Sequence, residues 1–138
     1  MIAYVDTSAL LRLVLSEPGG LEELRSCQAL VSSELIAVES LRTIDRLRLQ
    51  GALSTEEAAS RREAATEWLE ALDLVLLQTS VLARASEPFP TPLGTLDALH
   101  LSTALVWQDR THQKLIMATH DRDLALAARS FGFDVRGV

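Results

Sequence analysis

The sequence predicts an α/β fold, with one three-layer domain over residues 1–138 and a mostly parallel sheet between helices. Short apolar runs of strand length alternate with longer runs of helical period, which favours parallel strands joined by right-handed crossovers. The length of 138 residues suffices for one proper core and is too short for two comfortable domains. No repeat, low-complexity tract or linker interrupts the chain.

The first half of the chain contains two predicted strands among four helical segments. In order, they are a strand at 2–6, helical segments at 8–15 and 21–29, a strand at 29–32, and long helices from Ser32 or Ser33 to about Gln50 and from Ser54 to about Ala71. Gly51 separates the long helices. Ser54 and Glu57 have the spacing of a capping box, which predicts the start of the second one.

The second half is predicted to contribute three more strands. In order, we expect a buried strand at 73–77, a helix at 80–86, a helix from Thr95 to about Gln108, a strand at 114–119, a helix at 122–130 and an edge strand at 133–136. The proline-rich segment 87–94 is predicted to be a loop, because residues that precede proline disfavour the helical conformation.

The bulk composition is typical of a folded, cytoplasmic protein. Apolar residues make up 48% of the chain, yet no apolar run reaches the roughly 20 residues of a membrane span. No basic segment, apolar stretch and cleavage site open the chain. The single cysteine, Cys27, has no partner for an internal disulfide or a zinc knuckle.

The net charge of −6 argues against a general nucleic-acid binder, because phosphate contacts usually require a basic surface. An acidic domain can still act on nucleic acid when metal ions neutralise carboxylates in its active site. The charge therefore directs attention to acidic side chains that a fold could bring together.

Asp6 and Asp121 each end an apolar strand directly before a helix. Because ligands bind at the carboxyl ends of parallel strands, both side chains are expected at one edge of the sheet. Each could instead simply cap the helix that follows, as could Asp123 beside Asp121.

Glu39 and Asp97 are the other candidate acids. Glu39 lies close to the apolar stripe of its helix, although it could be a boundary residue paired with Arg42. Glu34 is a competitor in the first turn, where the helix dipole explains an acid well. The dipole could also explain Asp97, but its helix is apolar around much of its circumference, and a carboxylate there needs a partner.

The four acids together indicate a divalent-metal hydrolase. Several carboxylates in one place repel one another unless protons or a cation compensate, and hard oxygen ligands suit Mg²⁺ or Mn²⁺ better than zinc. His100 stands three residues after Asp97. It could be a metal ligand or a general base, but a buried histidine bonded to a backbone group or a carboxylate is the favoured interpretation.

These segments together resemble the PIN-domain family, and within it the VapC-type toxins of toxin–antitoxin pairs. The residues that carry the resemblance are Tyr4-Val5-Asp6-Thr7-Ser8, Ser32-Ser33 with Val38-Glu39, Leu96-Asp97-Ala98-Leu99-His100-Leu101-Ser102-Thr103-Ala104, Thr119-His120-Asp121-Arg122-Asp123-Leu124, and Gly132-Phe133-Asp134-Val135. The resemblance covers essentially the entire chain. His120 replaces the aromatic or small residue that is more usual before the fourth acid.

The resemblance implies a five-stranded parallel sheet and a Mg²⁺- or Mn²⁺-dependent endoribonuclease that a small cognate antitoxin protein inhibits. It also implies a homodimer, and the apolar helix end at Trp68-Leu69 could supply either a dimer surface or core. RNA is then the substrate.

The mechanistic hypothesis assigns all four acids to metal binding. Asp6 and Asp97 hold a metal directly, while Glu39 and Asp121 bind its waters or a second ion. A metal-activated water attacks the phosphate and leaves a 5′-phosphate product. Hydroxyls that could hydrogen-bond these groups, and arginines that could grip a phosphate or an antitoxin carboxylate, are Thr7, Ser8, Thr119, Arg12 and Arg42.

Two other interpretations remain open. A metal-dependent phosphatase of the haloacid-dehalogenase type also begins with an Asp after the first strand, but it needs a second Asp where this chain has Ser8. A catalytically inactive PIN-like module that binds a partner is the alternative from a different class. A receiver domain is rejected, because Lys114 begins its strand rather than ending it.

Overall fold

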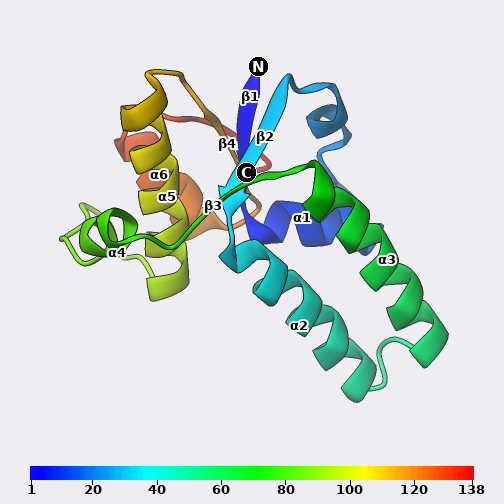
Figure 1. Cartoon of the computed structure of the whole chain (residues 1–138). Helices are drawn as coiled ribbons and strands as arrows, with labels where there is room; N and C mark the ends of the chain where they lie inside the picture. Colours follow the sequence, from blue (N-terminus) through cyan, green and yellow to red (C-terminus); the bar gives the residue numbers. More distant parts are fainter.

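A sheet of five parallel strands forms the centre of the computed structural model, which describes all residues 1–138 (Figure 1). The strands are β1 (Ile2–Val5), β2 (Ala29–Ser33), β3 (Asp73–Val75), β4 (Ile116–Ala118) and β5 (Asp134–Arg136). They lie in the order β3-β2-β1-β4-β5, and every neighbouring pair is parallel. The α/β fold and the five-stranded parallel sheet are thereby confirmed.

Helices cover both faces of this sheet, as a three-layer domain requires. They are α1 (Thr7–Val14), a 3₁₀ turn η1 (Glu22–Ser26), α2 (Leu35–Leu49), α3 (Thr55–Ala71), α4 (Thr79–Ala85), α5 (Thr95–Thr111) and α6 (Arg122–Ser130). Helices α1, α2 and α3 lie on one side, and α5 and α6 lie on the other with α4 packed on α5 (Figure 1). None of the seven has both the length and the apolar character that crossing a membrane requires.

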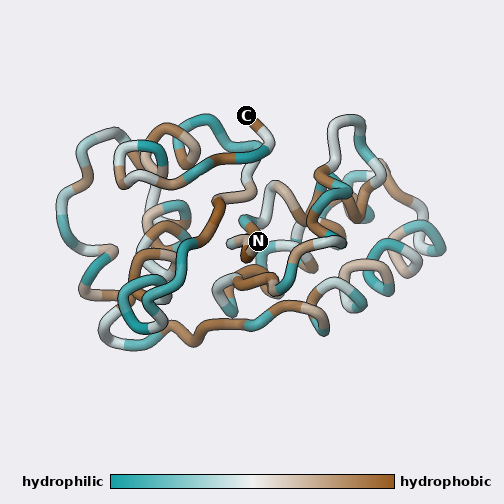
Figure 2. The backbone as a smooth tube through the Cα atoms, turned by 90° about the horizontal axis from the view of Figure 1, so that it is seen from above, coloured by the Kyte–Doolittle hydropathy of each residue, from teal (hydrophilic) through white to brown (hydrophobic).

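The alternating side chains of β1 divide the core in two. Ala3 and Val5 pack with the α1–α3 side, whereas Tyr4 packs with the α5–α6 side. Successive residues of a strand point to opposite faces, so the continuous apolar run of β1 serves both cores. Seen from above, hydrophobic and hydrophilic segments alternate along the helices, as expected where one helix face packs on the sheet and the other meets solvent (Figure 2).

Two predicted elements differ from the structure. The helical piece expected at 21–29 is only the short 3₁₀ turn η1. The strand expected to be buried at 73–77 ends at Val75 and forms one edge of the sheet, where Leu74 is 39% exposed. An apolar run alone does not distinguish a central strand from an edge strand, because the difference depends on which neighbours cover it.

Most predicted helix starts are confirmed, with one change of role. Ser54 and Glu57 form the capping box at the start of α3. At the start of α2, the Ser33 hydroxyl accepts a hydrogen bond from the Leu35 N–H at 3.2 Å. Glu34 does more than complement the helix dipole, because its Oε2 accepts from the Leu77 N–H at 2.6 Å and ties the segment after β3 to α2.

The strand order places the switch point of the sheet between β1 and β4. From β1 the chain proceeds outward through β2 to β3, and it then returns to the other side of β1 with β4. The crevice at the carboxyl ends of β1 and β4 is the place where open parallel sheets bind ligands. Asp6 follows β1 directly, and Thr119 to Asp121 follow β4.

Candidate active site at the switch point

Asp6 is buried at the carboxyl end of β1 and accepts three hydrogen bonds on one oxygen. Its Oδ2 accepts from the Ser8 hydroxyl at 2.6 Å, from the Thr119 hydroxyl at 2.8 Å and, at 3.4 Å, from the Ser8 N–H. The last of these makes Asp6 the N-cap of α1. Its Oδ1 takes no hydrogen bond from the protein, so capping and a binding role use different atoms.

Thr119 connects Asp6 to Asp121 at the end of β4. While its hydroxyl donates to Asp6, its Oγ1 accepts from the Asp121 N–H at 3.0 Å. Asp121 Oδ1 caps α6 by accepting from the Leu124 N–H at 2.8 Å. Asp121 Oδ2 is free of such contacts, so the second predicted strand–acid–helix junction repeats the arrangement of the first.

Glu39 reaches the same region from α2. Its Oε1 accepts from the Thr7 hydroxyl at 2.9 Å and lies 2.6 Å from His100 Nε2. The alternative pairing with Arg42 does not occur, because no hydrogen bond or ion pair joins the two side chains. Glu39 is therefore fixed by groups from α1 and α5, its own helix contributing none.

His100 is completely buried beneath this carboxylate. Its Nδ1 lies 2.7 Å from the Tyr4 hydroxyl, and its Nε2 is 3.8 Å from Asp6 Oδ1. Burial by itself lowers the pKa of the imidazole, but the hydrogen bond with Glu39 and the charges of Asp6, Glu39 and Asp97 outweigh it and raise the pKa. The expectation that His100 bonds a carboxylate in the interior is confirmed.

Asp97 stands at the centre of the negative charge. It lies in the first turn of α5, is half-buried and makes no hydrogen bond. Burial raises its pKa, the charges of Asp121, Asp6 and Glu39 raise it further, and His100 opposes them, so that the pKa is about 6. The other three predicted acids thus act on the carboxyl group of Asp97, as expected if all four meet in one site.

The donor set fits a divalent cation in its chemistry, although no three side chains are yet arranged to hold one. No group of three or more His, Cys, Asp or Glu side chains in the chain has the geometry of a metal site. Each of the four acids nevertheless keeps at least one carboxylate oxygen without a hydrogen bond from the protein. Hard, unengaged oxygens beside an unpaired half-buried acid are what Mg²⁺ or Mn²⁺ would bind.

A family model described as the PIN domain matches residues 3–130 of this sequence. The chain belongs to the PIN domain family. That match includes all four acids, and PIN domains generally use a divalent metal ion. Among curated proteins, no sequence matches the chain.

Two solved structures share the fold of this PIN domain. The chain is similar to VapBC2 from Rickettsia felis, crystallised with a DNA fragment from its promoter, at 12% identity and a TM-score of 0.68, over 99% of this chain and 98% of that one. It is also similar to a toxin–antitoxin complex from Klebsiella pneumoniae, at 15% identity and a TM-score of 0.61, over 89% and 90% of the two chains.

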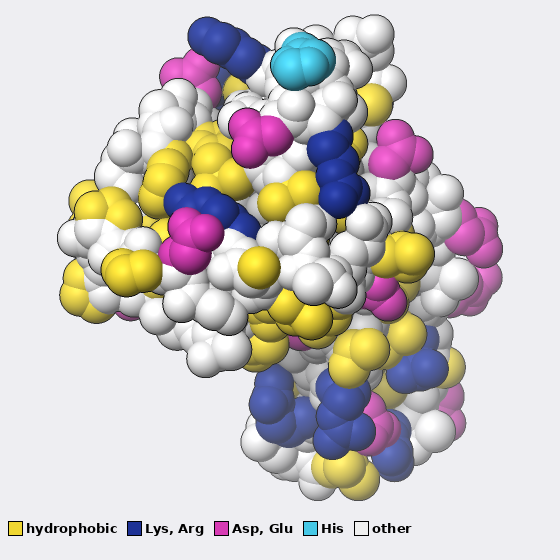
Figure 3. Space-filling model, turned by 60° about the vertical axis from the view of Figure 1, so that its left-hand side comes forward, with side chains coloured by type: hydrophobic (Ala, Val, Ile, Leu, Met, Phe, Trp, Pro, Cys, Tyr) yellow, Lys and Arg dark blue, Asp and Glu magenta, His cyan; other side chains and the backbone are white.

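Three further candidates lie outside the acid cluster of the PIN domain. Arg12 lies 3.9 Å from Glu17, on the far end of α1. Arg42 is exposed on α2 without a hydrogen bond or ion pair, and arginine side chains gather on the projecting lobe of α2 and α3 (Figure 3). Asp123 is exposed in the first turn of α6 and does not contribute to the raised pKa of Asp97.

Sequence reasoning missed Tyr4 as part of the site. Tyr4 lies in the middle of a buried strand, and in the sequence it stands out only as part of the opening segment of the family pattern. Its hydroxyl accepts from the Ser33 N–H at 3.2 Å and contacts His100. A tyrosine in a fully apolar strand was the available signal, because a buried phenol needs a hydrogen-bonding partner.

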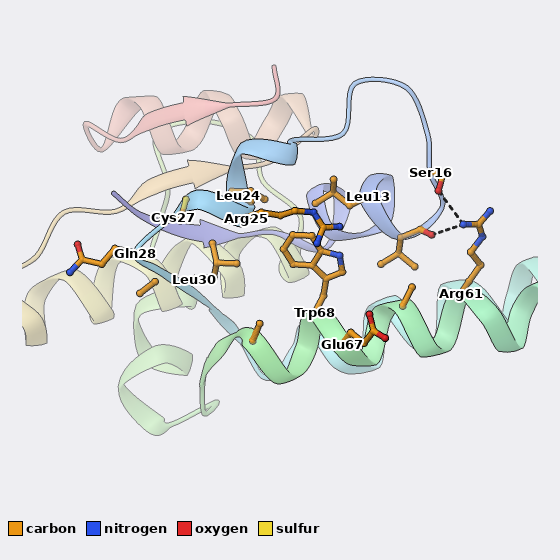
Figure 4. A pocket seen from close by; sticks show the side chains of 14 residues that line it. Leu13, Ser16, Leu24, Arg25, Cys27, Gln28, Leu30, Arg61, Glu67 and Trp68 are labelled. Atoms are coloured by element: carbon orange, nitrogen blue, oxygen red, sulfur yellow. Dashed lines mark hydrogen bonds between the residues drawn. The ribbon is translucent and has the colours of Figure 1, made fainter.

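The largest cavity of the PIN domain, about 530 Å³, is separate from the acids. It lies between α3 and the segment that leads from α1 to β2 (Figure 4). Arg25 stacks on the Trp68 ring at 4.6 Å, and Arg61 closes one end by donating to the Val14 carbonyl and to Ser16. No acid of the cluster lines this cavity.

Proposed function

We propose that this PIN domain is a Mg²⁺- or Mn²⁺-dependent endoribonuclease that acts as the toxin of a toxin–antitoxin pair. The observation that supports the proposal most is that Asp97, whose pKa burial raises, lies near enough to Asp121, Asp6 and Glu39 for their charges to raise it further. The site lies at the switch point of the sheet, where such folds bind ligands. The match to the PIN family supports the same assignment.

In the proposed mechanism, Asp6 and Asp97 hold the cation directly, and Glu39 and Asp121 bind its waters or a second ion. A divalent ion bound there lowers the pKa of a water molecule and stabilises negative charge on the scissile phosphate. Ser8 and Thr119 hold Asp6 through Oδ2 and so leave Oδ1 available. The hydrogen bonds to Oδ2 fix the orientation of the Asp6 carboxylate, while Oδ1 can still bind a cation.

The proposed partners are RNA, a small antitoxin and a second copy of the chain. Both similar structures are described as toxin–antitoxin proteins, which supports an antitoxin here. Arg42, exposed and unpaired one turn after Glu39, is the better placed of the two arginines for gripping a phosphate or an antitoxin carboxylate. Trp68 and Leu69 pack partly against the core, so the dimer would need other apolar side chains such as Val38 or Leu49.

The test is cleavage of labelled RNA by purified protein with Mg²⁺, with Mn²⁺ and with EDTA. We expect cleavage only with a divalent ion, 5′-phosphate ends on the products, and loss of at least 100-fold in rate for Asp6→Asn and Asp97→Asn. Glu17→Gln, which changes an exposed acid just beyond the end of α1, is the control and should cleave normally. Turnover similar to wild type in either Asp variant would remove that residue from the metal site.

A catalytically inactive binding module is the second candidate, and one observation favours it. No three potential ligands are arranged to hold a metal. RNA that stays intact under every divalent-ion condition would favour this alternative. A phosphatase of the haloacid-dehalogenase type is disfavoured, because Ser8 stands where that chemistry needs a second Asp and its hydroxyl is committed to Asp6.

A further inference from the structure

His100 has a hydrogen-bonding partner on each ring nitrogen although no part of it is exposed. Nδ1 lies 2.7 Å from the Tyr4 hydroxyl, and Nε2 lies 2.6 Å from Glu39 Oε1. A carboxylate only accepts hydrogen bonds, so Nε2 carries a proton and donates it to Glu39. A cation could bind this imidazole only by displacing a partner, so the arrangement disfavours His100 as a metal ligand.

Tyr4, like the imidazole that it contacts, is fully buried and held by hydrogen bonds. It is completely buried in the central strand β1, its hydroxyl accepts from the Ser33 N–H of β2, and its ring meets the His100 ring edge to face at 5.8 Å. The orientation of His100 is therefore determined by two neighbouring strands of the sheet. A series of contacts therefore leads from the sheet through Tyr4 and His100 to Glu39, a carboxylate of the proposed site.

Glu39 receives both of its hydrogen bonds on one oxygen. The Thr7 hydroxyl and His100 Nε2 both meet Oε1, which leaves Oε2 without a protein partner. A glutamate on an α-helix has three rotatable side-chain bonds, so without these two contacts it could adopt many orientations. Thr7 is in turn 3.3 Å from His100 Nε2, which closes a compact group of three side chains.

We propose that Tyr4 and His100 form a buried positioning pair that fixes Glu39 so that its free oxygen can serve the divalent cation. His100 is then a positioning residue that touches neither the ion nor the substrate. The inference rests on the proposed function of the acid cluster. Groups that orient a ligand from behind typically change metal affinity by 10- to 100-fold when they are removed.

The experiment measures Mn²⁺ binding by calorimetry without RNA, so it does not depend on turnover. His100→Leu replaces the imidazole by an apolar side chain of similar bulk and so removes both nitrogens, and we expect Mn²⁺ affinity to fall at least tenfold. His100→Gln retains an N–H near the position of Nε2 and should recover part of the loss. Tyr4→Phe keeps the ring and should produce a smaller reduction than His100→Leu.

The matched control is His112→Asn, at the other end of the same helix. His112 is exposed and adopts a left-handed conformation that asparagine tolerates well, so Mn²⁺ affinity should not change. Thermal unfolding without metal checks that each variant folds. If His100→Leu does not fold, Tyr4→Phe and His100→Gln decide the question alone.

The outcomes separate this inference from the proposed function. If wild-type protein binds Mn²⁺ and cleaves RNA while folded His100→Leu and Tyr4→Phe bind Mn²⁺ equally well, the positioning pair is wrong and the nuclease stands. If affinity falls equally in His100→Leu and His100→Gln, the donated hydrogen bond is not the cause and the inference is also wrong. Wild-type protein that binds no divalent ion would overturn both.

Discussion

Thr119 Oγ1 lies 2.8 Å from Asp6 Oδ2, and this hydrogen bond joins two side chains that are 113 positions apart in the sequence. Thr119 Oγ1 also accepts a hydrogen bond from the Asp121 N–H at 3.0 Å. One hydroxyl therefore links the acids that follow β1 and β4, the two strands on either side of the switch point. The distance between these acids depends on a residue that carries no charge.

Replacing Thr119 by valine should loosen this link. The change removes a donor to a buried carboxylate and an acceptor for the Asp121 N–H, and we expect the free energy of unfolding to fall by about 1–2 kcal/mol. If Asp6 helps to bind the cation, Mn²⁺ affinity should also fall. Urea unfolding and calorimetry measure the two effects.

Thr66→Val is the matched control for this variant, because the exposed Thr66 hydroxyl bonds only the Arg62 carbonyl in its own helix. It should leave Mn²⁺ affinity unaltered. A Thr119→Val protein that matches Thr66→Val in both measurements would show that the link to Asp6 is not needed.

The raised pKa of Asp97 makes stability depend on pH in a direction that can be derived. In the folded protein the pKa is about 6, against 3.8 for the unperturbed group, so folding favours the protonated acid. The folded state binds more protons between these values, and stability falls as the pH rises through that window. Above pH 6 the full destabilisation by Asp97 is present.

Asp97→Asn should therefore stabilise the metal-free protein at pH 7.5 but not at pH 3.8 or below. Because the group is half-buried, solvent screening reduces the expected gain to about 1 kcal/mol. Thermal or urea unfolding in EDTA at the two pH values measures it. A loss of stability at pH 7.5 would mean that the carboxylate is compensated in the folded protein.

Cation binding should displace the proton from Asp97. At pH 6 this carboxyl is about half protonated, and a divalent ion requires it ionised, so Mn²⁺ binding should release about half a proton. At pH 8 almost none should be released. Calorimetry in buffers of different ionisation enthalpy counts the protons, and an identical count at both pH values would contradict a role for Asp97.

At Gly137, the C-terminal segment passes so close to the end of β4 that only a residue without a side chain fits. The φ of Gly137 is +108°, and a Cβ there would lie 2.2 Å from the Thr119 carbonyl oxygen. In Gly137→Ala the segment must move, and the Thr119 N–H should lose its bond to the Arg136 carbonyl. We expect faster amide hydrogen exchange at Thr119.

Gly51→Ala is the control, because it introduces the backbone strain of a positive φ without the steric clash expected in Gly137→Ala. Gly51 also has a positive φ, of +77°, but a Cβ there would meet nothing within 4 Å. Exchange at Thr119 should stay slow in this variant. Equal exchange in both variants would show that the C-terminal segment does not hold the end of β4.

Local features of the sequence predicted much of the fold and of the site. The capping box at Ser54 and Glu57 involves only two residues three positions apart, so the local sequence is sufficient to predict it. Asp6 and Asp121 were recognisable because each follows an apolar strand and precedes a helix. Glu39 and Asp97 were weaker signals, supported by the family resemblance as well as by their helices.

Contacts between distant segments could not be predicted in this way. Glu34 looks like a first-turn acid in the sequence, yet it accepts a hydrogen bond from the Leu77 N–H, in the segment after β3. The strand expected to be buried at 73–77 ends at Val75 and forms an edge of the sheet. Its apolar run is the same in either position, because burial depends on the strand order and not on the strand itself.

By itself, the sequence determined where strands and helices begin, which acids follow the strands, and which family pattern they complete. Those features depend on side-chain period and on hydrogen bonds within one or two turns. Only the tertiary structure decided that His100 donates to Glu39 and rests on Tyr4. These contacts depend on the order of the strands and on which helix covers which face of the sheet. Neither property can be recognised from a short stretch of sequence.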